Sequence, residues 1–111
     1  MSTHRIDRLQ EEMRHLVSSI LLFEVTDPRV KGVTLTRVLL TKDLSIGRIY
    51  YETSATKEER ELVQKGLERA SGFIRKKVAA QLPLRTLPHF EFYYDETQEE
   101  LSRVDRLFTQ I

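Results

Sequence analysis

The chain contains no cysteine and no tryptophan, few glycines and prolines, and no long apolar run. Without cysteine, disulfide bonds and thiolate chemistry are excluded, which is compatible with a reducing cytosol. The apolar stretch at residues 20–23 is far too short to cross a bilayer. Acids and bases occur throughout residues 1–19, so this segment lacks the apolar centre of a signal peptide. We therefore expect a cytoplasmic protein with no membrane partner.

Length and composition indicate one small folded domain. The 111 residues are 40% hydrophobic and 32% charged, which is too apolar for a disordered chain and too charged for a membrane protein. We expect residues 1–111 to form a single domain, in which residues 97–111 are a C-terminal helix or tail.

Charge is distributed unevenly, although the net charge is only +1. Residues 65–89 hold six lysines and arginines against a single acid, Glu68. Residues 90–111 hold six acids and two arginines. The net charge therefore says little about partners, but the first of these segments is basic enough to attract a polyanion.

Residue spacing in the first half predicts a helix followed by a hairpin. Apolar residues recur at helical spacing from Ile6 to Leu21, with Thr3 or Ser2 as the expected cap. The Asp27-Pro28 turn should end this helix near residue 25. Residues 33–41 and 46–53 read as strands joined by a hairpin loop at 42–45. The alternation slips at residues 37–38, which indicates either a bulge or burial on both faces.

The second half predicts a kinked helix, a strand and a final helix. A helical pattern covers residues 57–82, and Thr56 with Glu59 resembles a capping box. Gly72 lies inside that pattern, and the pair Ser71-Gly72 predicts a kink. Residues 90–94 alternate as a strand does. A second capping box, Thr97 to Glu100, should start a short helix whose apolar positions are Leu101, Val104, Phe108 and Ile111.

The kinked helix separates an apolar face from a basic one. At about 100° per residue, Lys65, Arg69, Gly72 and Lys76 lie within roughly 80° of one another. The apolar residues on the opposite side are Val63, Leu67, Ala70, Ile74 and Val78. Glycine lets another backbone approach closely, and a kink should expose N–H groups of the following helix, which favour a phosphate. Alternatively, Gly72 permits internal packing and the bases form a solvated face, as a lone basic stripe usually does.

The order strand, helix, kink, helix, strand resembles the KH domain, in which a turn between two helices clamps a nucleic-acid backbone. This chain has Ala70-Ser71-Gly72 where a KH domain has its Gly-x-x-Gly loop. An Ala-x-Gly junction after an N-terminal helix and strand is similar to the ribosome-binding factor A family. Further similar stretches cover nearly the whole chain: Ile6 to Ile20, Asp27-Pro28-Arg29, Val33-Thr34, Val38 to Leu44, Leu84-Arg85 to Pro88, and Phe90-Glu91-Phe92 to Asp95.

The resemblance implies an α+β, type II KH-like fold of order α-β-β-α-kink-α-β with a short C-terminal helix, and a three-stranded sheet with helices on one face. It implies a monomeric, cold-adaptation factor that binds the free 30S small ribosomal subunit and its 16S rRNA, not the joined 70S ribosome. Such factors assist late maturation and 5′-end processing of 16S rRNA. The implied RNA-binding residues are Lys65, Arg69, Ala70, Ser71, Gly72, Arg75, Lys76, Lys77 and Arg85, with Arg29 and Lys31 as weaker candidates.

Enzymatic patterns are not found in the sequence. His4, His15 and His89 have no metal-ligand spacing, and no Gly-rich phosphate loop follows a strand. We therefore expect no catalysis, no metal or other cofactor, and no small-molecule substrate. An alternative is a protein-binding adaptor that acts through the acidic tail or an open sheet face. Strand aromatics on such a face could stack on bases, and the candidates are Phe90, Phe92, Tyr50, Tyr51 and Tyr93. We expect Phe90 and Phe92 in the core, and Tyr51 or Tyr93 on the open face.

Overall fold

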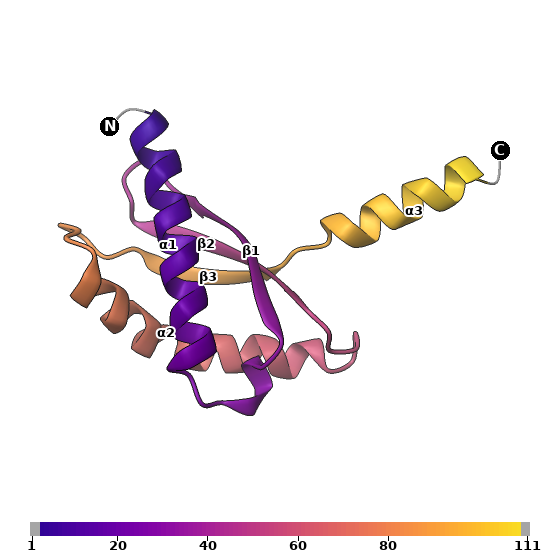
Figure 1. Ribbon diagram of the computed structural model, residues 1–111, viewed down its shortest axis with the longest axis horizontal. Coiled ribbons are helices and arrows are strands. Elements are labelled where there is room, and N and C mark those ends of the chain that lie inside the picture. The colour runs from indigo at the N-terminus through magenta and orange to yellow at the C-terminus, as the bar shows by residue number, and fades with distance from the viewer. Residues whose placement is uncertain (1–2, 110–111) are drawn as a thin grey trace.

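The computed structural model describes residues 3–109, except for the side chains of Thr3, Ser102, Phe108 and Thr109. The elements are α1 (Thr3–Phe23), a 3-10 turn η1 (Pro28–Val30), β1 (Val33–Leu40), β2 (Ile46–Thr53), α2 (Arg60–Gln81), β3 (His89–Tyr94) and α3 (Thr97–Thr109). This is the predicted α+β order (Figure 1). The expected cap at Ser2 or Thr3 and the expected apolar positions Phe108 and Ile111 fall outside the described residues and side chains.

The three strands form one mixed sheet in the order β1-β2-β3. β1 and β2 are antiparallel, as their short connection requires, whereas β2 and β3 are parallel and are connected through α2. The pairing of β1 with β2 shifts between Leu35 and Arg37, so the bulge is confirmed about one residue before the expected place. Beyond this shift, buried positions move from odd to even residue numbers, which accounts for the slip in the pattern.

Both long helices pack on the same face of the sheet, as Figure 1 shows for α1 in front of β1 and β2. The buried core takes residues from every strand and from both helices: Met13, Val17, Ile20, Leu35, Val38, Ile49, Tyr51, Val63, Leu67, Ile74, Val78, Phe90 and Phe92. Phe90 and Phe92 are therefore core residues, as expected. Tyr51 is only 1% exposed, so its placement on the open face was wrong. Its hydroxyl donates to Gln64 Oε1 at 2.6 Å and so joins β2 to α2.

The hairpin between β1 and β2 is closed by Asp43, as its turn chemistry predicts. Asp43 Oδ1 accepts from the Thr41 hydroxyl at 2.8 Å and from the backbone N–H of Ser45 at 3.0 Å. The next residue, Leu44, has φ 61°. For a residue with a Cβ, the left-handed conformation costs about 1–2 kcal/mol, so leucine is an unfavourable choice at this position.

α2 is one α-helix of 22 residues and contains Gly72 in its interior. Figure 1 shows its C-terminal part running at an angle to its N-terminal part, in agreement with the predicted bend. The chain does not divide into two helices there, however, so the expectation that the junction exposes the N–H groups of a second helix was wrong. The helix begins at Arg60, three residues later than expected, because residues 57–59 form a turn. The expected contact forms in that turn, where Glu59 N–H donates to the Thr56 hydroxyl at 3.3 Å, whereas the N-cap of α2 itself is Glu59, without a side-chain cap.

α3 forms as expected but is capped by a different residue. Asp95 Oδ1 accepts from the backbone N–H of Thr97 at 3.0 Å, so Asp95 caps the helix and the expected cap by Thr97 was wrong. In Figure 1, α3 extends away from the sheet. Arg60 holds its first turn through an ion pair with Glu99 at 2.6 Å. The acidic end of the chain therefore lies beside the start of α2, not over Gly72.

We expect Asp95 to make the free energy of unfolding depend on pH in the acidic range. The Thr36 hydroxyl at 2.6 Å and the Thr97 donors lower the pKa of this carboxyl, which is 7% exposed. The pKa of Asp95 is lower in the folded than in the unfolded chain. Its contribution to the free energy of unfolding is therefore fully present above the unfolded-state pKa of about 4, and it is lost as the pH falls through the folded-state pKa. Asp95→Asn should reduce the free energy of unfolding by about 1 kcal/mol at neutral pH.

Urea denaturation at neutral pH and at about pH 3 measures this contribution. The difference between Asp95→Asn and the unchanged chain should shrink on acidification. A difference that stays constant between the two pH values would contradict the assignment.

Candidate nucleic-acid interface

The basic face of α2, which we define as Lys65, Arg69, Gly72 and Lys76, is exposed over its whole length. Among the described residues, Arg69 and Lys76 form no ion pair, and Lys65 has only Glu61 at 3.6 Å. Both partners of that pair are well exposed, so it is weak and salt-sensitive. Glu68, on the border of this face, accepts a hydrogen bond from Gln64 at 3.2 Å. The three cations therefore remain available to an external anion.

Gly72 lies on this face between Arg69 and Lys76 along the helix axis, with open space above it. A Cβ added at Gly72 would meet no atom within 4 Å, so nothing in the described part of the fold needs a glycine there for packing. Gly66, six residues earlier, differs: a Cβ there would lie 3.1 Å from Arg29 Cβ and from Val30 Cγ1. The close packing of position 66 against η1 explains why a glycine is needed there. Internal packing, the alternative explanation for Gly72, is therefore not supported.

Two of the expected RNA-binding cations have partners within the chain. Arg75 donates from Nε to the carbonyl oxygen of Pro88 at 2.9 Å and from Nη2 to that of Leu87 at 3.4 Å. It therefore fixes the loop that leads from α2 into β3. Lys77 forms an ion pair with Glu24 at 3.1 Å and so joins α2 to the end of α1. These two side chains have structural roles that the sequence did not reveal.

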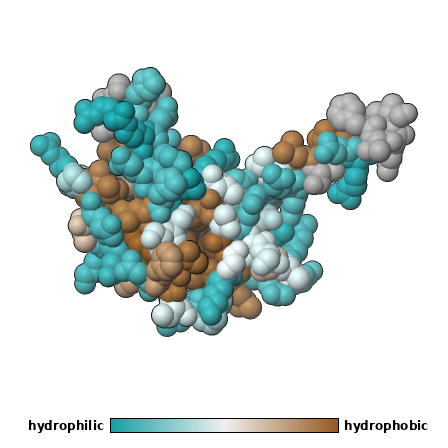
Figure 2. Space-filling model, in the orientation of Figure 1, coloured by the Kyte–Doolittle hydropathy of each residue, from teal (hydrophilic) through white to brown (hydrophobic). Residues whose placement is uncertain are grey.

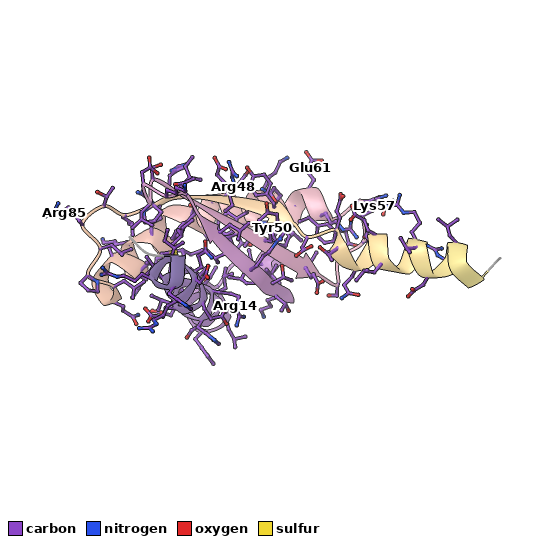
Figure 3. All side chains as sticks on the ribbon, turned by 90° about the horizontal axis from the view of Figure 1, so that it is seen from above. Arg14, Arg48, Tyr50, Lys57, Glu61 and Arg85 are labelled. Carbon is purple, nitrogen blue, oxygen red and sulfur yellow. The ribbon has the colours of Figure 1, made fainter. Side chains whose placement is uncertain are left out.

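The remaining candidates are distributed around this face. Ala70 is half-buried against the core, and Ser71 lies in a groove between α2 and β3. Arg85 is exposed on the loop after α2 and projects from one end of the molecule in Figure 3. The structure thus groups Lys65, Arg69, Gly72 and Lys76, and it separates Arg85 from them.

Arg29 is held by Asp27, whereas Lys31 is exposed without an ion pair among the described residues. The guanidinium of Arg29, its backbone N–H and the nearby charge of Arg69 together lower the pKa of Asp27 to about 2. Asp27 is therefore ionised at neutral pH and neutralises Arg29, which lies 2.7 Å away. Arg29 is consequently a weaker anion ligand than the cations of the basic face.

The open sheet face carries an aromatic cluster that sequence analysis found only in part. Tyr50 and Tyr93 stack with their ring centroids 5.6 Å apart, and the Arg37 guanidinium lies 4.1 Å from the Tyr50 centroid. Tyr93 is 42% exposed, which confirms its place on this face. Its neighbour on this face is Tyr50 and not Tyr51, because the parallel register of β2 with β3 pairs Tyr50 with Tyr93.

In the described part of the chain, no group of three or more histidine, cysteine or acidic side chains is arranged to hold a metal ion. Within the same residues, no helix combines the length and apolar character needed to cross a membrane.

Comparison with known proteins identifies one family. The family model described as ribosome-binding factor A matches residues 5–108. The ribosome-binding factor A of Lacticaseibacillus casei is 39% identical over 109 residues, which cover 97% of this chain and 93% of the relative. That of Streptococcus mutans is 37% identical over 112 residues, covering 100% of this chain and 97% of the relative.

Solved structures show the same fold. The crystal structure of ribosome-binding factor A from Thermus thermophilus has a TM-score of 0.73 at 25% identity, covering 80% of this chain and 93% of the other. The solution structure of a Thermotoga maritima protein has a TM-score of 0.74 at 35% identity, covering 84% and 89% of the two chains. Together with the three-stranded sheet and its helices, these likenesses confirm the predicted fold class.

Proposed function

The chain belongs to the ribosome-binding factor A family, and from that premise we propose that it binds the free 30S small ribosomal subunit through the basic face of α2. In this proposal the ligand is the ribose-phosphate backbone of 16S rRNA. The factor acts by binding alone, as a cytoplasmic monomer, without a cofactor or a small-molecule substrate. It assists late maturation and 5′-end processing of 16S rRNA, a role that matters most for growth in the cold, and it does not bind the joined 70S ribosome.

The observation that carries this proposal is Gly72, exposed among Lys65, Arg69 and Lys76, where an added methyl group would meet nothing within 4 Å. A glycine in a helix interior costs about 1 kcal/mol relative to alanine, and here no internal contact offsets that cost. An RNA backbone can lie closely against the helix only where no side chain projects, as at Gly72. The surrounding cations supply its counter-charges.

This kind of binding positions a protein without reading bases. Lysine and arginine contacts with phosphates fix register and orientation but carry no sequence information. We therefore expect weak base specificity, with the shape of the subunit determining where the factor binds. The continuous helix offers no free N–H donors at Gly72, so the three side chains provide the attraction.

Cosedimentation with purified small subunits tests the proposal. The double variant Arg69→Ala/Lys76→Ala removes two unpaired cations and should reduce binding at least about tenfold. A matched control, Lys42→Ala/Lys57→Ala, removes two exposed lysines outside the basic face of α2 and should bind normally. Circular dichroism should show that all variants remain folded. Unchanged binding by the Arg69/Lys76 variant, or equal binding of the unchanged chain to joined ribosomes, would refute the proposal.

A second candidate function is a protein-binding adaptor that acts through α3. This helix extends from the sheet with exposed Leu101, Val104 and Leu107 and has two acids in its first turn. Replacing these three apolar residues with serine should leave subunit binding unchanged if α2 is the interface. Loss of binding in that variant alone would favour the adaptor.

A further inference from the structure

A second basic surface lies at the opposite end of α1 from its junction with η1. Residues from the N-terminal half of α1, the β1–β2 hairpin and the loop after α2 surround a groove of about 400 Å³. That volume lies within the range of small-molecule pockets, roughly 300–1,000 Å³. Figure 2 shows apolar surface between the hydrophilic N-terminal half of α1 and this loop. The groove is separate from the basic face of α2, since it contains none of the residues of that face.

Three arginines line the groove, two from α1 and one from the loop: Arg5, Arg8 and Arg85. All three are exposed, and none forms an ion pair within the described part of the chain. The acid in the lining is Glu12, so cations outnumber it. α1 has no acid in its first turn, and a helix start favours anions. The walls therefore suit a ligand with more than one negative charge.

The floor of the groove is aliphatic. Leu9, Leu44 and Leu84 contribute to its lining, and all three are half-buried. Leu44 is the non-glycine residue with a positive φ, 61°, in the described chain, a conformation that asparagine or glycine adopts more readily. A leucine held in that conformation with its side chain at a groove indicates that the apolar group itself is needed there.

The loop that carries Arg85 is fixed in place. Arg75 donates to the carbonyl oxygens of Leu87 and Pro88, and Leu84 packs against the core. Arg85 therefore extends from a positioned loop, and it lines the same groove as the two arginines of α1. A preformed site loses less conformational entropy when it binds a ligand.

We propose that this groove holds an unpaired nucleotide of RNA, with its base on the leucine floor and its neighbouring phosphates on Arg5, Arg8 and Arg85. The proposal rests on the rRNA-binding function proposed above and adds a second contact to it. Guanidinium groups both bind phosphate in a bidentate manner and stack on bases, whereas an apolar floor is of no use to a phosphate alone. A nucleotide unites the two chemistries that the groove offers.

The experiment compares a short oligouridylate with a blunt RNA duplex of the same length, each titrated into the full chain. Bases in a duplex are stacked and cannot enter the groove. Arg8→Ala/Arg85→Ala should weaken binding of the single strand about tenfold or more and that of the duplex much less. Leu44→Asn keeps every charge and relieves the unfavourable φ, yet should weaken single-strand binding about threefold or more. The control Arg103→Ala/Arg106→Ala removes two exposed arginines of α3 and should bind both RNAs normally.

Each other outcome overturns the inference in a recognisable way. Equal losses on both RNAs would mean a phosphate contact without a base site, and no loss on either would mean no site. Tighter binding of a polyglutamate peptide, abolished by Arg8→Ala/Arg85→Ala, would assign the groove to an acidic protein segment. Because Lys65, Arg69 and Lys76 are intact in these variants, the groove inference can fail while subunit binding through α2 stands. The reverse holds for Arg69→Ala/Lys76→Ala.

Discussion

Gly72→Ala should make the protein more stable and a poorer ligand of the small subunit. Alanine in a helix interior is favoured over glycine by about 1 kcal/mol, and the added methyl group meets no atom within 4 Å. The same methyl group occupies the surface against which a phosphate backbone is proposed to lie. We expect binding to weaken about tenfold for alanine and further for Gly72→Leu.

Urea denaturation and subunit binding, measured on the same preparations, test whether the substitution raises stability while it weakens binding. Gly66→Ala is the control within the same helix, because its methyl group would lie 3.1 Å from Arg29 Cβ and Val30 Cγ1. The same helix preference for alanine applies there, but the crowding opposes it, so Gly66→Ala should gain less stability than Gly72→Ala does. If Gly72→Leu binds subunits as well as the unchanged chain does, no backbone approaches α2 at this point.

The salt dependence of binding should become shallower as cations are removed from the basic face of α2. Each phosphate contact releases a counterion, so the slope of log K against log salt should fall by about 0.7–0.9 for each lost contact. Lys65→Ala/Arg69→Ala/Lys76→Ala should thus lower the slope by about 2–3. The loss of affinity should be largest at low salt.

Lys77→Ala distinguishes direct phosphate contacts by the basic face of α2 from a general effect of positive charge. Lys77 pairs with Glu24, so its removal frees an acid and should change the slope less than removal of Lys76 does. Titrations of labelled protein with small subunits across a range of salt concentrations give the slopes. Equal slopes for the triple variant and the unchanged chain would contradict direct phosphate contacts.

The regular elements were predictable because their patterns are local. Alternation over residues 90–94 predicted β3 and the burial of Phe90 and Phe92, and helical spacing predicted the buried residues of α2. The basic face of α2 followed from the same spacing, since residues on one helix keep their relative angles in any fold. These features depend on sequence neighbours alone.

The features that sequence analysis missed depend on residues far apart in the chain. Arg75 and Lys77 looked like their neighbour Lys76, but the carbonyl of Pro88 and the carboxylate of Glu24 are brought to them by the tertiary structure. Asp95 caps α3 and also accepts a hydrogen bond from the hydroxyl of Thr36, which lies 59 residues away in the sequence. Spacing along the chain does not show such partners.

We expect the basic face of α2 to lie against 16S rRNA when the protein is bound to the small subunit. Because the chain has no cysteine, Lys76→Cys creates a single attachment point for a tethered iron chelate that generates hydroxyl radicals. A chelate attached through Val104→Cys on α3 is the matched control, since that position is also exposed. We predict strong local cleavage of 16S rRNA from position 76 and little from position 104 when the labelled chains are bound to small subunits. Cleavage from position 104 with none from position 76 would contradict the account.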